Sequence, residues 1–517
     1  MFIDYSKAKG YEYGTVKKSI REEGKTKKVK VRNLGRVIDK ERGIFRSLNL
    51  GLYCYDLATD TISPVPDGFE PPSTNTKKLP RQILSISFGD VFLLDEYLKK
   101  TGFIKAVDAI DHKNQDTLHA LLSFYILCSL ANCHAENWWE VTYARYLYPK
   151  ANLASQRISE VLKDIGSEDA KRKFFKEYFR FLERRAETNG GSNGITDGIL
   201  IDSSGLPNAI HFPLTAINNH NGVVSEEVRL IYVVQQHTGM PLFFRYVAGN
   251  VVDVSTIKRT IAELKANGVN TKFAILDAGY YTGINADALL DAGVSFMARM
   301  KGNFKVYKDA VRDHLGELEA KENAVIFHHR LVYVKCIECR IGQKENRQAY
   351  AYLCKDMTMS RIESTHTIEH AVDKGLSGED VFDEIQRLGV FILVSTRKVA
   401  KENVLSLYYM RDRVEKIFEI CKQGSKILPV SVQSEATFRG HLMMTFMAAA
   451  VLKMMSVVLR DTPLTTETAF FNLSHQNALV YENELITNEP VKLMNEAYKI
   501  FGIECPVSIP LRKLDVS

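Results

Sequence analysis

Hydrophobic and polar residues alternate along residues 11–60 in the manner of β-strands, for example from Lys28 to Arg32 and from Gly51 to Tyr55. This alternation predicts a small β-rich module at the N-terminus. Five of the 14 prolines then fall within residues 62–80. Because proline breaks both helices and strands, this stretch is predicted to be a linker.

From about Ile83 to Glu187 the apolar residues recur at helical spacing. The segments 115–146, 155–165 and 170–187 show this spacing most clearly, so we expect a helical region. A glycine-rich break follows at Asn189 to Gly198.

Short apolar runs that end in an acid appear twice after this break, as Ile199-Leu200-Ile201-Asp202 and as Lys272 to Asp277. Between and after them the pattern predicts a hairpin, two helices and a further strand, which together indicate mixed α/β structure. These elements are expected at 229–235 with 241–247, at 254–266, at 285–291 and at 294–299. Residues 302–400 contain strand-like stretches with polar breaks, and we interpret them as an insertion that is mostly β. Residues 441–459 are almost all apolar and predict a buried helix.

The stretch from Tyr408 to Lys422 predicts a helix with two distinct faces. At about 100° per residue, Tyr408, Arg411, Glu415 and Lys422 fall within a stripe of about 60°. An adjoining apolar arc contains Val414, Ile417, Phe418 and Cys421. An ordinary amphipathic helix with surface ion pairs would give the same pattern. However, an acid flanked by Arg and Lys, with a Tyr one turn away, suits a metal ligand among phosphate-binding cations.

The length of 517 residues predicts two to four structural units, and the composition is that of a soluble globular protein. The net charge of +6 is unevenly placed. Residues 1–50 hold 14 Lys and Arg against 6 Asp and Glu, a balance of +8 that leaves −2 for the rest. A basic arm of this kind favours a polyanionic partner, with nucleic acid first, although a solvated basic surface is the alternative.

The eight cysteines are scattered, and several lie inside apolar runs as reduced, buried thiols do. The N-terminus has no signal-peptide pattern, and the longest apolar run, 442–452, is too short to span a bilayer. We therefore expect a cytoplasmic protein that does not act at a membrane. Cys336 and Cys339 have zinc-like spacing, but strand alternation explains them better.

Three acids are candidate metal ligands: Asp202, Asp277 and Glu415. Neighbouring parallel strands would bring the two aspartates side by side, and Glu415 would join them from a helix packed across the sheet. Clustered carboxylates suit Mg²⁺ or Mn²⁺, and two such ions about 4 Å apart catalyse phosphodiester chemistry. Each acid taken alone is also explained as a strand-end turn or cap. Asp197 and Asp253 are nearby competitors of lower rank, because they occupy a glycine-rich loop and a helix N-cap position.

These motifs resemble those of the DDE transposases of bacterial insertion sequences, in the branch with a Tyr-(2)-Arg-(3)-Glu-(6)-Lys signature. Tyr408, Arg411, Glu415 and Lys422 meet that signature without a spacing error. Four further blocks are similar to family blocks: Ile201 to Pro207, Gly249-Asn250 with Asp253, Asp277 to Tyr281, and Arg439 to Leu442. The resemblance covers roughly residues 195–460.

The resemblance implies a ribonuclease H-like catalytic core with a β-rich insertion. It further implies that Asp202, Asp277 and Glu415 are catalytic and hold two Mg²⁺ or Mn²⁺ ions. Tyr408, Arg411 and Lys422 would bind the terminal phosphates of DNA. In the family, a metal-bound water cuts the transposon end, and the freed 3′-hydroxyl attacks target DNA within a homodimer assembled on paired terminal inverted repeats. Such a protein is cytoplasmic and nucleoid-associated. An inactive DNA-binding descendant and a nuclease without strand transfer are the two alternatives.

The expected organisation has seven parts. They are a basic β-rich module (1–61), a linker (62–80), a helical DNA-end-binding region (81–190), the first part of the core (191–301), the β-rich insertion (302–400), the second part of the core (401–460) and a C-terminal tail (461–517).

Overall fold

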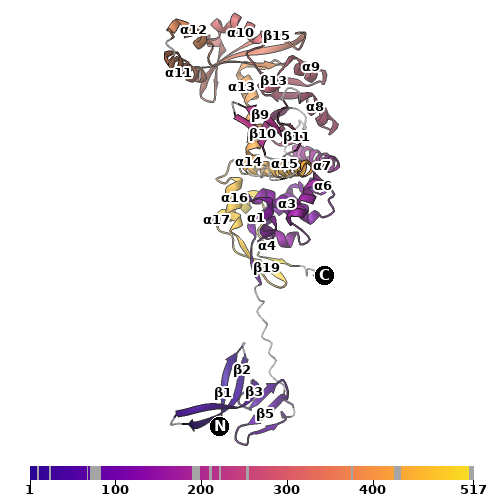
Figure 1. Ribbon diagram of the computed structural model, residues 1–517, viewed down its shortest axis with the longest axis vertical. Coiled ribbons are helices and arrows are strands. Elements are labelled where there is room, and N and C mark those ends of the chain that lie inside the picture. Colours follow the sequence, from indigo (N-terminus) through magenta and orange to yellow (C-terminus); the bar gives the residue numbers. More distant parts are fainter. Residues whose placement is uncertain are drawn as a thin grey trace. The chain divides into compact units, whose positions relative to one another are not determined.

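The computed structural model describes residues 1–8, 11–22, 25–66, 68–69, 83–188, 198–208, 212–220, 223–251, 256–373, 376–423, 432 and 434–511. The chain divides into two compact units, Met1–Arg81 and Gln82–Ser517, and Figure 1 shows the elements of each. Most of the predicted linker 62–80, together with Asp197 and Asp253, lies outside the described residues.

The N-terminal unit is a six-stranded antiparallel sheet in which each strand pairs with the next along the chain. Its small core is formed by five buried side chains, Val16, Leu34, Phe45, Tyr53 and Tyr55. The β-strands predicted for residues 11–60 are therefore confirmed. The strands are β1 (Phe2–Ala8), β2 (Tyr11–Glu22), β3 (Lys25–Asp39), β4 (Ile44–Ser47), β5 (Gly51–Asp56) and β6 (Thr61–Ser63).

The second unit begins with the predicted helical region. Its elements are β7 (Leu84–Ser87), α1 (Gly89–Thr101), α2 (Ile104–Asp108), α3 (Gln115–Leu127), α4 (Ala135–Val141), α5 (Ala144–Leu147), α6 (Ser155–Ile165) and α7 (Glu168–Thr188). The segment 115–146, which we predicted as one helical stretch, is broken after α3. The break follows from the extended backbone of Cys128, which ends the hydrogen-bonded turns of that helix.

Residues 461–511, predicted only as a tail, fold onto this helical region. Strand β18 (Asn477–Val480) pairs with β7, and β19 (Glu484–Thr487) and β20 (Ser508–Pro510) complete a four-stranded sheet. Helix α16 (Thr466–Ser474) contacts α1, and α17 (Lys492–Phe501) contacts both. Sequence periodicity could not reveal this pairing because β7 and β18 are almost 400 positions apart.

The centre of the second unit is a ten-stranded sheet in the order β11-β10-β8-β12-β13-β17-β16-β15-β14, with β9 paired to β10. Strands β8, β10 and β11 are antiparallel neighbours, whereas β8, β12 and β13 run parallel. The first strands are β8 (Ile199–Pro207), β9 (Ala216–His220), β10 (Val223–Gln235), β11 (Pro241–Ala248), β12 (Phe273–Leu276) and β13 (Ser295–Met300). Helices α8 (Ile257–Ala266) and α9 (Gly283–Asp291) lie between them in the chain, as the pattern predicted.

The region 302–400 extends the same sheet, because β17 pairs with β13. Its strands are β14 (Ala324–Phe327), β15 (Arg330–Ile341), β16 (Arg347–Asp356) and β17 (Val390–Ser395). The prediction that this region is mostly β is wrong, since it also forms the helices α10 (Lys305–His314), α11 (Met357–Asp373) and α12 (Gly378–Arg387). Only Ser360 and Ala371 of α11 are buried, so the hydrophobic pattern of this helix gave no signal.

Helix α15 (Glu435–Val458) packs against α3, α6, α14 and β11, and it lies between the helical region and the sheet in Figure 1. Its length and composition would allow it to cross a membrane, but 78% of its most apolar window is buried inside the protein. The helix predicted at 441–459 is thus confirmed as a core helix.

Candidate functional site

The two aspartates lie side by side because their strands are parallel neighbours in register. Ile201 of β8 pairs with Leu276 of β12, and Asp202 and Asp277 are the next residues on each strand. Asp277 ends its strand as predicted. Asp202 does not, because β8 continues to Pro207 along β10. The residues after Asp202 are small and polar, so their strand structure depends on this pairing and not on a hydrophobic pattern.

The stretch from Tyr408 to Lys422 is not one helix, as we had expected, but two. Helix α13 (Lys401–Tyr409) ends before Met410 and α14 (Asp412–Gln423) begins after Arg411. The backbone amide of Arg411 donates to the carbonyl of Tyr408 at 3.1 Å, in a tight turn between the two helices. Tyr408 therefore belongs to a different helix from Glu415 and Lys422, and the angles of a single helix do not apply to it.

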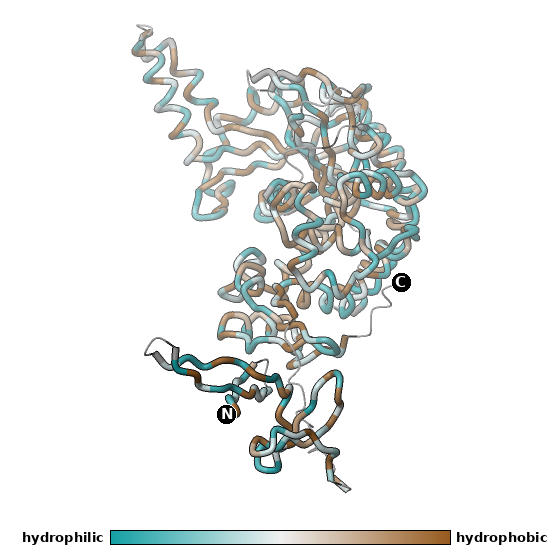
Figure 2. The backbone as a smooth tube through the Cα atoms, turned by 60° about the horizontal axis from the view of Figure 1, so that its bottom comes forward, coloured by the Kyte–Doolittle hydropathy of each residue, from teal (hydrophilic) through white to brown (hydrophobic). Residues whose placement is uncertain are grey.

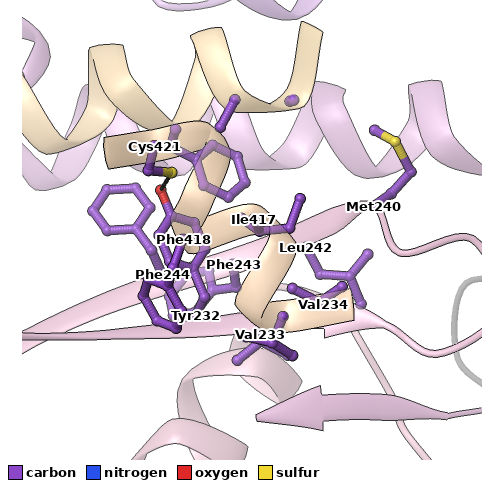
Figure 3. Packing of buried hydrophobic residues seen from close by; sticks show 14 of the residues in the cluster. Tyr232, Val233, Val234, Met240, Leu242, Phe243, Phe244, Ile417, Phe418 and Cys421 are labelled. Carbon is purple, nitrogen blue, oxygen red and sulfur yellow. Dashed lines mark hydrogen bonds between the residues drawn. The ribbon is translucent and has the colours of Figure 1, made fainter. Parts of the chain in front are cut away.

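The apolar face predicted for α14 is confirmed. Val414, Ile417, Phe418 and Cys421 are buried, and Figure 3 shows three of these side chains against strands β10 and β11. The Cys421 thiol donates to the hydroxyl of Tyr232 at 3.3 Å. Tyr232 pairs directly with Asp202, so α14 covers the face of the sheet on which that carboxylate lies.

The three candidate acids converge on the guanidinium group of Arg411. Its Nη1 lies 3.0 Å from Asp202 Oδ2 and 3.2 Å from Asp277 Oδ1, and its Nη2 lies 3.1 Å from Glu415 Oε1. Because one nitrogen contacts both aspartates, their two oxygens are at most about 6 Å apart. Three side chains from two strands and a helix thus meet at one point.

Solvent exposure rises across the site. The side chain of Asp202 is 14% exposed, that of Asp277 is 36% exposed and that of Glu415 is 56% exposed. Burial raises the pKa of Asp202 to about 6, although the charge of Arg411 opposes this shift. Burial would lower the pKa of Arg411, but the surrounding carboxylates, chiefly Asp202, outweigh it and raise that pKa.

Glu415 lies between Arg411, in the turn before α14, and Lys422, near the end of that helix. The ammonium group of Lys422 is exposed and donates to Ser204 Oγ at 2.9 Å. Ser204 is two residues beyond Asp202 on β8 and so lies on the same face of the sheet. We did not predict a role for Ser204, and its spacing from Asp202 was the only available signal.

Tyr408 occupies a different environment from the other signature residues. Its side chain is only 4% exposed, and burial raises its pKa. Its ring packs edge-on against Tyr409 at 5.5 Å between centroids. A contact between Tyr408 and DNA would require the side chain to leave this packed position.

Arg413 is a further residue that the sequence did not single out. Its Nη1 donates to the backbone carbonyls of Gln236 and His237, in the turn that joins β10 and β11. It thereby attaches the start of α14 to the sheet, which helps to fix the position of the neighbouring Arg411.

The donor set suits a hard divalent cation, since all three acids offer carboxylate oxygens. Within the described residues, no group of three or more His, Cys, Asp or Glu side chains is close enough to hold a metal ion as it stands. The reason lies in the contacts of Arg411, whose guanidinium takes the central cationic position and one oxygen of each acid. The residues fit a metal if this guanidinium turns aside. Cys336 and Cys339 are three positions apart on β15, so they point to opposite faces and do not form a zinc site together.

Comparison with known proteins identifies this region. Residues 195–451, about half of the chain, match the family model of the transposase DDE domain. No curated protein sequence matches the chain. Among solved structures, the cryo-EM structure of a piggyBac transposase synaptic complex with hairpin DNA aligns at 10% identity and a TM-score of 0.35, over 74% of this chain and 70% of that one. The family match runs from the segment before β8 into α15 and includes every element that contributes to the carboxylate cluster. The chain therefore carries a transposase DDE domain and is a DNA transposase.

Proposed function

We propose that this protein cleaves DNA at the ends of a transposon and joins the freed 3′-hydroxyl to target DNA. The observation that supports this proposal is the convergence of Asp202, Asp277 and Glu415 on one guanidinium group, 3.0 to 3.2 Å away. Three carboxylates of this kind are a ligand set suited to metal-dependent phosphodiester chemistry.

The three acids would hold two Mg²⁺ ions, or Mn²⁺, in the active state. When bound, the ions would supply an activated water or 3′-hydroxyl and would stabilise the leaving oxygen. Arg411 offsets part of the negative charge of the acids, and the same guanidinium can turn to bind a DNA phosphate. Lys422, exposed beside Ser204, is in reach of a second phosphate on the same face.

The sheet order supports a ribonuclease H-like core, in which three antiparallel strands, β11, β10 and β8, precede two parallel ones, β12 and β13. We also propose that the chain belongs to the insertion-sequence branch that Tyr408, Arg411, Glu415 and Lys422 define by their spacing. In this proposal two copies act together on paired terminal inverted repeats, because each transposition event needs two DNA ends.

A strand-transfer assay tests the proposal. Purified protein is mixed with labelled transposon-end DNA, target DNA and Mg²⁺, and joined products are expected. Nicked ends without joining would indicate a nuclease, and binding without nicking would indicate an inactive descendant.

Glu415→Gln is expected to abolish cleavage while leaving end binding within a few-fold of the wild type, since only the charge of one carboxylate is lost. Glu419→Gln is the matched control, because Glu419 is exposed on the same helix one turn further on. Equal loss of binding and cleavage in Glu415→Gln would indicate a structural role for Glu415.

A further inference from the structure

Strands β2 and β3 extend beyond the core of the N-terminal unit as a two-stranded ribbon. The core ends at Val16 on β2, and β1 reaches β2 only as far as Lys17. Beyond that point β2 pairs with β3 alone, from Lys18 opposite Val29 to Glu22 opposite Lys25. Where the ribbon leaves the core, the pairing shifts by one residue at Val31, a bulge that increases the local twist.

The ribbon is strongly basic on both faces. Lys17, Arg21, Lys28 and Lys30 share one face, and Lys18 and Lys27 lie on the other. The sequence has no acid in 17–21 or in 26–34. Figure 2 shows the chain near the N-terminus with hydrophilic stretches interrupted by short hydrophobic ones.

Among the described residues, two cations of the ribbon and its base each form an ion pair. Lys17 contacts Asp4 at 2.5 Å, and Arg32, at the base of the ribbon, lies 3.4 Å from Asp60. Within the described part of the chain, the five outer cations make no ion pair: Lys18, Arg21, Lys27, Lys28 and Lys30. All five are exposed.

This arrangement is unfavourable for the isolated protein. Lys17 and Lys30 are directly opposite each other, and like charges in that position destabilise a sheet, although the contact of Lys17 with Asp4 offsets part of this repulsion. A two-stranded ribbon without packing is at best marginally stable in water, and Val29 and Val31 are 39% and 47% exposed. A polyanion that binds the cations would reduce the repulsion and stabilise the ribbon.

We propose that the β2–β3 ribbon is a DNA-binding arm that lies in the major groove of duplex DNA. The major groove admits a two-stranded antiparallel ribbon, and cations on both faces then meet the phosphates on both sides of the groove. The exposed Val29 side chain faces the same way as Lys18 and Lys27 and is suited to contact thymine methyl groups. This inference deepens the proposed function and rests on it, since the duplex is the DNA of transposition.

The test uses the full chain and measures the dissociation constant for duplex transposon-end DNA as a function of salt. The ribbon variant replaces Arg21, Lys27, Lys28 and Lys30 by Gln. The matched control replaces Lys301, Lys308, Lys321 and Lys344 by Gln, which removes the same charge from exposed positions of the second unit that make no ion pair among the described residues.

The ribbon variant is expected to bind at least tenfold more weakly and to lose up to about 3.6 units of the slope of log K against log salt, because each of the four phosphate contacts contributes about 0.9. The control is expected to stay within a few-fold of the wild type with an unchanged slope. A ribbon variant that binds like the control would overturn the proposal.

Two further measurements separate this outcome from other failures. Replacing Lys27, Lys28 and Lys30 by Arg retains the charge and is expected to bind like the wild type, and loss of binding there would also contradict the proposal. In the same assays, wild-type protein that binds DNA without cleaving it would count against the proposed function. That result would not contradict the proposal that the ribbon binds DNA. Normal cleavage by the wild type, combined with normal binding by the ribbon variant, would support the proposed function and contradict the role of the ribbon.

Discussion

Arg411 is the residue on which the geometry of the site depends. Its guanidinium contacts three carboxylates that would otherwise repel one another at short range. The same position is the one that a divalent cation would occupy between the acids. Arg411 therefore acts as an internal cation in this structure, and a divalent ion bound as proposed would compete with this side chain for the same oxygens.

Arg411→Ala is expected to lower the free energy of unfolding by about 2 kcal/mol without metal, since charged hydrogen bonds contribute about that much. Excess Mg²⁺ should restore the stability, because an ion that binds only the native state stabilises it. Thermal unfolding with and without Mg²⁺ measures both effects. Lys416→Ala, at an exposed position on α14, serves as control. It should alter neither the stability without metal nor the effect of Mg²⁺ on stability. A Mg²⁺ response no larger than that of the wild type would contradict this competition.

The raised pKa of Asp202 predicts how the stability of the protein depends on pH. Its pKa in the folded state is about 6, above the ordinary 3.8, so the native state binds more protons than the unfolded state between these values. The contribution of Asp202 to stability is therefore full below about pH 4 and is lost as the pH rises through 6. Asp202→Asn removes this dependence, and its stability relative to the wild type should rise by up to about 3 kcal/mol over that window. Chemical denaturation at several pH values checks the slope, and parallel pH profiles for both proteins would contradict the shift.

At the scale of elements, two glycines let α6 and α15 cross closely. A Cβ atom on Gly440 would lie 1.8 Å from the carbonyl oxygen of Leu162, and one on Gly166 would lie 2.6 Å from the amide nitrogen of Gly440. The contacting atoms are backbone and cannot move aside as a side chain would. This crossing holds α15, and with it α14, against the helical region.

Gly440→Ala is accordingly expected to destabilise the protein by about 2 to 3 kcal/mol through overpacking. Helix propensity alone would favour alanine there by about 1 kcal/mol, so the sign of the change distinguishes the two effects. Gly316→Ala is the control, because nothing lies within 4 Å of its added Cβ atom. Equilibrium unfolding in urea measures both variants, and a stabilised Gly440→Ala protein would argue against the close crossing.

At the scale of the whole molecule, the chain has two separate hydrophobic cores. The five-residue core of Met1–Arg81 shares no member with the large core of Gln82–Ser517. A protein that lacks residues 1–81 is therefore expected to keep the circular dichroism and the main unfolding transition of the second unit. Calorimetry of both proteins tests this, and loss of the main transition on truncation would mean that the second unit depends on the first.

Much of the site was predictable from local pattern. A strand followed by an acid identified Asp202 and Asp277, and the spacing around Glu415 identified the buried face of α14. The break at Met410 and Arg411 was not predictable, because the apolar spacing continues through it. The helix α11 was not predicted because it buries only two side chains, which is too few to give apolar residues at helical spacing.

The sequence alone determined which acids are the candidate ligands, where the chain is basic and which helix is buried, because each of these depends on neighbours within a few turns. Only the tertiary structure decided that one guanidinium joins three carboxylates, and that β7 pairs with β18 while Ser87 bonds to the carbonyl of Ser474 at 2.7 Å. Contacts between distant positions arise from packing and strand pairing. The hydrophobic periodicity of one segment does not indicate which distant segment it will contact.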